Sequence, residues 1–136
     1  MALISTRLVA AAVVALLDGD TYLTAYLSQG PTPPAGRTVV VHPVAGEPDG
    51  VLGDPGRDLL VRFQTTAIGT TAEQALWTHD AVATRLWRQS VSGTGWATLP
   101  IRDIPGSQQP VWRDDTLADP IYTVTCMWLA TAQPTT

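Results

Sequence analysis

The chain has 136 residues, the length of one ordinary domain, so residues 1–136 are expected to form a single domain. The net charge at pH 7 is −4, every basic residue is an arginine, and no basic stripe occurs, which argues against direct binding of nucleic acid. Charged residues make up only 15% of the chain, and a surface so poor in charge is typical of a protein that is partly covered by partners.

The N-terminal part predicts a helix and a connector. Residues 2–17 are rich in helix formers and apolar on most sides, and Asp18-Gly19 ends the run. No small-residue cleavage site follows, so we interpret the run as a buried helix rather than a secretory signal. Residues 20–29 are expected to form a short turn of helix or irregular structure. The segment GPTPPAG (30–36) predicts a stiff connector.

The middle of the chain predicts two strands and a second helix. Residues 37–44 predict a strand whose proline confines that end to an edge or a strand terminus. The turn-rich residues 45–57 predict a loop. Residues 58–69 alternate between an apolar and a mixed face, as a half-buried strand does. Residues 71–90 predict the second long helix, with a threonine as its N-cap.

The C-terminal part is predicted to be β. Residues 96–104 and 108–114 each predict a strand, and residues 120–130 predict the longest one. Both faces of that last strand are largely uncharged, so we expect it to be central or covered on both sides. The tail AQPTT is expected to fray or to dock onto a neighbour. The order α-β-β-α-β-β-β predicts a two-layer α+β domain, with two main helices packed on a mixed or antiparallel sheet of four or five strands.

The turn-rich loop holds the acids of greatest interest, Glu47, Asp49, Asp54 and Asp58. A calcium loop needs oxygen ligands at alternate positions and a glutamate at its twelfth, and this pattern is absent. A phosphate loop needs Lys-Ser or Lys-Thr at the start of a helix, whereas this loop has no lysine and leads into a strand. We therefore expect no metal and no cofactor here.

The remaining polar candidates do not form a catalytic motif. His42 and His79 are far apart in the sequence, and no G-x-S-x-G nucleophile elbow occurs. His79 lies on the apolar stripe of the second helix, where a core or interface histidine is the commoner role. Asp114-Asp115 is typical of a solvated turn. Cys126 is expected to be a buried, inert thiol. The sequence does not predict an enzyme.

Tryptophan is unusually frequent, with five in the chain: Trp77, Trp87, Trp96, Trp112 and Trp128. Aromatic platforms that stack bases come with a cationic groove, which the composition lacks. Tryptophan is also enriched at protein interfaces. We expect core and subunit interface to account for these residues, with Trp77, Trp87, Trp112 and Trp128 as the candidates for the interface.

Several quoted segments resemble one known family. The N-terminal helix leads through QGPTPPAG into VVVHPVAG, and the most specific block is GDPGRDLLVRFQTTAIGTTAEQALW (53–77). Together with the final aromatic strand, these segments resemble the tail terminator and tail-completion proteins of long-tailed, siphovirus-type phages that infect actinobacteria. The resemblance covers roughly the whole chain and is weakest at 91–118.

The resemblance implies a structural virion protein that assembles in the host cytoplasm. Such proteins form a ring, usually a hexamer, that caps the tail tube, stops its polymerisation and docks to the neck proteins of the head. The implied partners are further copies of this chain, the major tail tube protein and the head-closure proteins, with no membrane. DNA would pass through the lumen without specific binding. The loop with Glu47, Asp49, Asp54 and Asp58 is then expected at the lumen or on the tube-facing surface.

Two alternatives remain open on the sequence. The first is another neck role, as a head-closure, head-tail joining or minor tail protein, because these proteins share small α+β folds. The second is a small soluble enzyme or ligand-binding domain that uses His42, His79 and the acidic loop. That alternative predicts a concave pocket and perturbed titrations.

Overall fold

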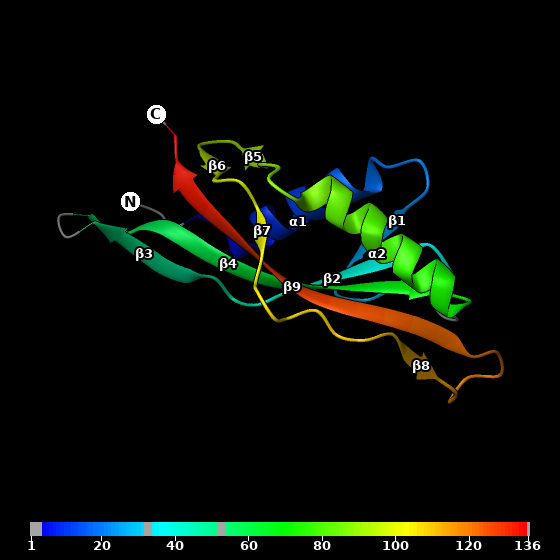
Figure 1. Ribbon diagram of the computed structural model, residues 1–136. Coiled ribbons are helices and arrows are strands. Elements are labelled where there is room, and N and C mark those ends of the chain that lie inside the picture. The colour runs from blue at the N-terminus through cyan, green and yellow to red at the C-terminus, as the bar shows by residue number, and fades with distance from the viewer. Residues whose placement is uncertain (1–3, 32–33, 52–53, 136) are drawn as a thin grey trace.

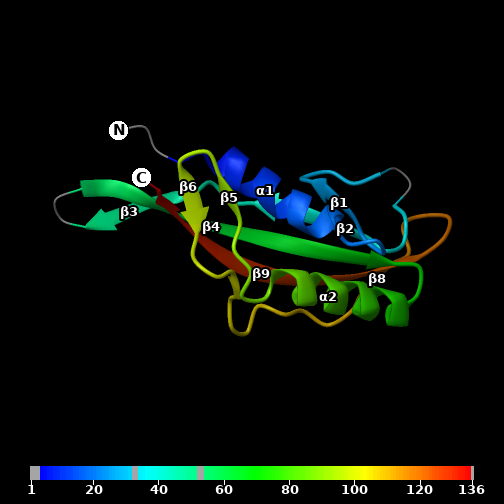
Figure 2. The ribbon, with the colours of Figure 1, turned by 90° about the horizontal axis from the view of Figure 1, so that it is seen from above.

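Two helices pack side by side on one face of a curled sheet in the part of the chain that the structure describes (Figures 1 and 2). The computed structural model describes residues 4–31, 34–51 and 54–135. The elements in chain order are α1 (Thr6–Asp18), β1 (Thr24–Leu27), β2 (Thr38–Pro43), β3 (Glu47–Val51), β4 (Asp54–Gly69), α2 (Ala72–Leu86), β5 (Ser92–Gly93), β6 (Trp96–Thr98), β7 (Arg102–Asp103), β8 (Trp112–Asp114) and β9 (Ile121–Pro134). The predicted α+β class is confirmed.

The long strands β4 and β9 form the middle of the sheet. The hydrogen-bonded order is β1-β2-β4-β9-β6-β5, while β3 pairs with β4, and β7 and β8 pair with β9. Only β1 and β2 run parallel among the pairs of the described strands, so the sheet is mixed. It holds nine strands within the described ranges, more than the four or five predicted. The predicted central position of the last strand is confirmed.

The core lies between the two helices and the face of the sheet that they cover. From Leu59 to Ala67 in β4 and from Val124 to Ala132 in β9 every second side chain is buried, because successive side chains of a strand point to opposite faces. The buried members are Leu59, Val61, Phe63, Thr65, Ala67, Val124, Cys126, Trp128, Ala130 and Ala132. Helix α1 contributes Val9, Val13 and Leu17 to the same core, and α2 contributes Val82 and Leu86.

Side-chain caps fix where both helices begin. The Ser5 hydroxyl accepts from the backbone N–H of Leu8 at 3.4 Å, so α1 begins at Thr6. The Thr71 hydroxyl accepts from the N–H of Gln74 at 3.0 Å, which confirms the predicted N-cap of α2. Helix α2 ends at Leu86, earlier than predicted, because Trp87 leaves the helical conformation with ψ 117°. Arg88 then adopts a left-handed φ of 60°.

Two predictions about loops were wrong. Residues 20–29 contain the strand β1, whose backbone pairs in parallel with β2 and whose Ala25 N–H donates to the Asp18 carboxylate at 3.1 Å. Residues 45–57 are mostly not a loop, since they form β3 and the first part of β4. These two strands pair antiparallel from Glu47 opposite Leu60 to Val51 opposite Asp54. The β3–β4 hairpin extends beyond the helices at one end of the molecule (Figure 1).

The C-terminal part differs from the simplest expectation in two places. The tail was expected to fray or to dock onto a neighbour, and it does not fray, because β9 continues to Pro134, which pairs with Trp96 of β6. The predicted strand 96–104 is two short strands, β6 and β7, joined by residues 99–101. Both pair with β9, so the segment after α2 lies along one edge of that strand.

Candidate functional site

The two histidines do not form a common site. His42 follows the core residue Val41 on β2, so its side chain points to the sheet face away from the helices. His79 lies on α2, which covers the other face. Within the described residues no group of three or more His, Cys, Asp or Glu side chains could hold a metal ion. No helix among those residues is long and apolar enough to cross a membrane.

His79 is half-buried, and its Nδ1 atom has no hydrogen-bond partner. Burial lowers the pKa of His79 below its ordinary value because it penalises the charged imidazolium, although the neighbouring Asp80 carboxylate partly offsets this. The neutral ring is therefore the form that the fold favours.

We expect this histidine to make the fold less stable in mild acid. As the pH falls below about 6.5, the unfolded chain takes up the proton before the folded one, so the stability present above that pH is progressively lost toward the lower folded pKa. The measurement is urea unfolding at several pH values for the wild type and for His79→Phe. The wild type should lose more stability than the variant, and equal slopes would contradict the prediction.

Cys126 lies in the core, as predicted, with 1% of its surface exposed. Burial raises the pKa of its thiol, and a contact at 3.8 Å with the Ser107 hydroxyl only partly opposes this. A thiol held in its protonated form is a poor nucleophile.

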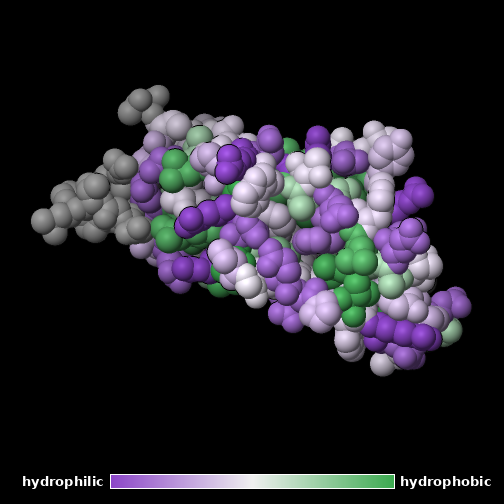
Figure 3. Space-filling view, viewed as in Figure 1, coloured by the Kyte–Doolittle hydropathy of each residue, from purple (hydrophilic) through white to green (hydrophobic). Residues whose placement is uncertain are grey.

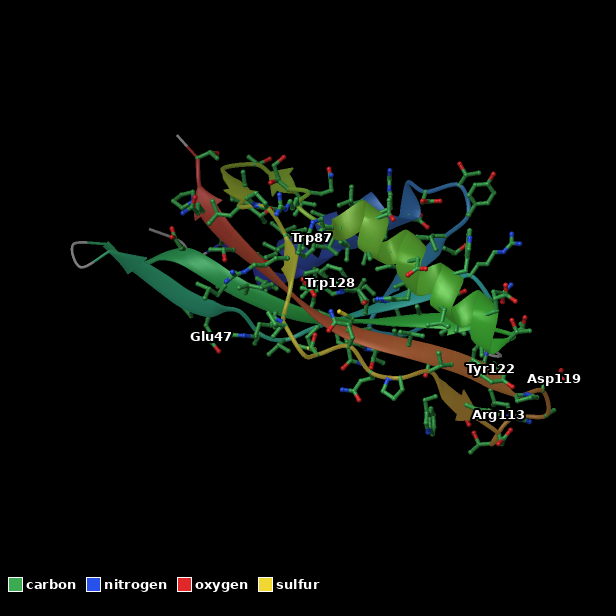
Figure 4. All side chains as sticks on the ribbon, viewed as in Figure 1. Glu47, Trp87, Arg113, Asp119, Tyr122 and Trp128 are labelled. Carbon is green, nitrogen blue, oxygen red and sulfur yellow. The ribbon has the colours of Figure 1, made fainter. Side chains whose placement is uncertain are left out.

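The four acids of the predicted loop lie on the β3–β4 hairpin. Glu47 forms an ion pair with Arg62 across the two strands, with 2.9 Å between Oε1 and Nη1. Asp49 is the backbone pairing partner of Asp58, and Asp58 also accepts a hydrogen bond from Gln133 at 3.3 Å. Asp54 is the first residue of β4. The hairpin therefore gathers these acids on one projecting element, which Figure 4 shows at the opposite end of the molecule from Asp119.

The tryptophans divide into two buried and three exposed side chains. Trp128 is 2% exposed, and its indole N–H donates to the Thr65 hydroxyl at 2.9 Å inside the core. It belongs to the core of the chain, which corrects its assignment to the subunit interface. Trp77, Trp87 and Trp112 are 43%, 46% and 62% exposed. Exposed tryptophans are candidates for an interface because tryptophan is enriched among the residues that contribute most to binding.

Trp77 belongs to an aromatic cluster near the first half of α2. The Tyr22 ring packs edge-on against the Trp77 ring with 6.1 Å between centroids. The Arg37 guanidinium lies 5.7 Å from the Trp77 ring centroid, as in a cation–π pair. Figure 3 shows a further hydrophobic patch between α2 and the segment that leads into β8.

Trp87 forms the wall of a groove at the C-terminal end of α2. The groove has a volume of about 390 Å³ and is lined by Trp87, Arg88, Pro100, Ile101 and Arg102. The Arg88 guanidinium lies 5.6 Å from the Trp87 ring centroid. The left-handed backbone at Arg88 turns the chain sharply at this point, so that the Arg88 N–H donates to the Ile101 carbonyl at 2.8 Å. We call these five residues the arginine groove.

Trp112 lies on β8, at a corner rich in carboxylates that we define as Trp112 to Asp119 and call the acidic corner. The Arg113 Nε donates to Asp115 at 2.6 Å, and its guanidinium lies 5.9 Å from the Tyr122 ring centroid. Asp114 accepts hydrogen bonds from the hydroxyl and the N–H of Thr116, which lower the pKa of its carboxyl. Arg113, Asp119 and Tyr122 are seen together in Figure 4.

Two of these surfaces carry a local sequence signal that the prediction did not use. Trp87-Arg88 and Trp112-Arg113 are both Trp-Arg dipeptides, in which a flat aromatic ring stands next to a planar cation. The contribution of Tyr22 and Arg37 to the Trp77 cluster carries no comparable signal, because the fold brings together residues that are far apart in the chain.

The sequence matches no protein-family model and no curated protein. Among solved structures the chain is similar to one described as belonging to the virion of a native gene transfer agent particle. The two share 19% sequence identity with a TM-score of 0.69, and the similarity covers 90% of this chain and 92% of the other. At this identity, the likeness establishes a common fold.

Proposed function

We propose that the protein is a structural component of a phage-like particle, and that within the particle it acts as a tail terminator. In this role several copies form a ring on the end of the tail tube, stop its growth and present the surface to which the head docks. The chemistry is that of assembly rather than catalysis, and DNA passes through the lumen of the ring.

One observation carries the proposal. The fold matches a chain from a gene transfer agent virion over nine-tenths of both chains, so the similarity extends to the whole domain rather than to a shared motif. A fold does not fix a function, and the specific role as a terminator rests on the sequence resemblance around residues 53–77. The two lines of support are independent of each other.

The surface of the described chain supports assembly. Trp77, Trp87 and Trp112 are all substantially exposed, and each lies next to an arginine. Tryptophan and arginine are the residues most enriched at the energetic centres of protein interfaces. A chain with 15% charged residues also has few charges to desolvate when large surfaces become buried.

The test is the mass of the purified protein by light scattering, with negative-stain images of the same fraction, alone and after addition of purified tail tubes. Rings, or caps at one end of the tubes, are the expected result. A protein that stays monomeric and leaves the tubes bare would contradict the terminator role. Binding to isolated neck proteins but not to tubes would instead assign the protein to the neck.

We further propose that the acidic β3–β4 hairpin faces the lumen or the tube. The hairpin projects from the body, and negative charge near passing DNA keeps the phosphates from being held. Reversal to Asp49→Arg and Asp54→Arg is expected to give assembled protein that retains double-stranded DNA, with retention falling as salt rises. The matched control reverses two exposed acids of α2, Glu73→Arg and Asp80→Arg.

The readout is co-sedimentation of DNA with the assembled protein at several salt concentrations. The control has the same change in net charge, so it separates the position of the hairpin from the overall charge of the chain. Equal DNA retention by both variants would place the hairpin away from the DNA path.

A further inference from the structure

The arginine groove carries more positive charge than its own chain neutralises. In the described part of the chain, neither Arg88 nor Arg102 lies within ion-pair distance of a carboxylate. Asp103 follows Arg102, but its carboxylate accepts a hydrogen bond from Gln108 at 2.6 Å. The walls and floor of the groove are Trp87, Pro100 and Ile101, so two guanidinium groups stand beside an apolar hollow.

The acidic corner has the opposite character. It presents Trp112, the most exposed of the large hydrophobic side chains in the described residues, from a strand that is hydrogen-bonded to β9. Three carboxylates, Asp114, Asp115 and Asp119, accompany a single cation, Arg113, which already pairs with Asp115. The acidic corner thus presents the Trp112 side chain from a hydrogen-bonded strand, in a region of net negative charge.

The two surfaces lie at opposite ends of α2. The acidic corner is near the beginning of the helix, since β8 pairs with β9 at Tyr122 and Tyr122 pairs with Gly69, just before α2. The arginine groove is at its C-terminal end, at Trp87. A helix of this length spans about 22 Å at 1.5 Å per residue, so one chain cannot bring its own corner into its own groove.

We propose that the acidic corner of one copy docks into the arginine groove of the next, with Trp112 seated against Trp87 and Pro100 and with the corner carboxylates facing Arg88 and Arg102. This inference rests on the proposed ring, and it names the contact that joins the copies. The occupant is a second copy because each surface supplies the shape and charge that the other lacks. A contact between two different patches is head-to-tail, and it makes a ring when its rotation closes.

Charge reversal gives a test with an internal rescue. The groove variant carries Arg88→Asp and Arg102→Asp, and the corner variant carries Asp115→Arg and Asp119→Arg. Each is expected to stay dissociated alone, because like charges then face each other across the contact. In an equal mixture, every groove can meet a corner of opposite sign, so assembly is expected to return with the variants alternating. Assembly of each variant and of the mixture is measured by light scattering and native mass spectrometry. If the wild type assembles only on tail tubes, the variants are tested with tubes present.

A second variant tests the aromatic anchor. Trp112→Ala is expected to weaken association by about 30-fold or more, the loss typical of a hot-spot residue. Leu8→Ala, which removes an exposed apolar side chain from α1, is the control and should leave association within about twofold. Melting curves by circular dichroism confirm that all variants fold.

The outcomes separate the two proposals. Assembly of the wild type together with unimpaired assembly of both charge variants and of Trp112→Ala would overturn this contact and leave the proposed function standing. Loss of assembly in each charge variant, without recovery of assembly in the mixture, would also overturn the proposed contact, because the two surfaces would then not meet. A wild type that remains monomeric with tubes present would overturn both.

Discussion

Replacement of Trp128 by alanine is expected to lower the free energy of unfolding by about 3–5 kcal/mol. Trp128 is among the largest fully buried side chains of the described residues, and it fills the space between β9 and the helices. Its removal leaves a large cavity and also leaves the Thr65 hydroxyl without the indole donor. The measurement is urea unfolding followed by circular dichroism, since the substitution itself changes the tryptophan fluorescence.

Two control variants separate packing from hydrogen bonding at this position. Thr65→Val keeps the volume and leaves the indole N–H unpaired, at an expected cost of about 1–3 kcal/mol. Trp112→Ala removes the same type of side chain from the surface and should change the stability by less than about 0.5 kcal/mol. A loss for Trp128→Ala as small as that for Trp112→Ala would show that the core repacks around the missing ring.

Alanine at Gly69 is expected to destabilise the fold by about 1–3 kcal/mol, a typical effect of overpacking. Gly69 ends β4 where α2 crosses it, and an added Cβ would lie within 2.3 Å of the Ala75 backbone nitrogen. Backbone atoms of a helix cannot move aside as the end of a flexible side chain can, so α2 must shift away from the sheet. Thermal unfolding of the variant and the wild type measures the effect.

Gly95→Ala is the matched control for Gly69→Ala. Nothing lies within 4 Å of a Cβ added at Gly95, but its φ of 82° is unfavourable for alanine, so a loss of about 1 kcal/mol is expected from the backbone alone. The Gly69 substitution should be the more damaging one. The reverse order would mean that α2 is loosely held at its N-terminal end.

Local patterns predicted the elements whose burial is regular. The alternation between an apolar and a mixed face that residues 58–69 predict is present in β4, because one face of this strand packs on the core. The N-cap of α2 was predictable because Thr71 bonds to a backbone group only three residues away. In both cases the information that decides the structure lies within the segment itself.

The errors arose where the deciding partner lies elsewhere. Thr24–Leu27 is only four residues long, and its strand conformation depends on parallel pairing with β2. The turn residues of the β3–β4 hairpin look like a long loop, but most of their backbone is hydrogen-bonded across the two strands. Pro134 stays in the sheet because Trp96, far away in the sequence, pairs with it.

The residue types that form the candidate surfaces could be predicted from the sequence, but their positions in the fold could not. The sequence singled out the tryptophans, yet it could not separate the buried Trp128 from the exposed Trp112, since both lie in strands. The arginine groove requires Arg88 and Arg102, which lie on either side of the β5–β6 pair in the chain, to meet at the same hollow. That meeting depends on the left-handed backbone at Arg88 and on the Arg88 N–H bond to Ile101.

The position of β9 determines when the protein can fold during its synthesis. This strand follows all the other described strands in the chain, yet it lies in the middle of the sheet, and β6, β7 and β8 all pair with it. Its ladder with β4 joins residues 53 to 73 positions apart, from Gly69–Tyr122 to Leu59–Ala132. Long-range pairing of this kind slows folding. The sheet therefore cannot form strand by strand in the order of synthesis, because β4, β6, β7 and β8 gain their shared partner only once β9 is present.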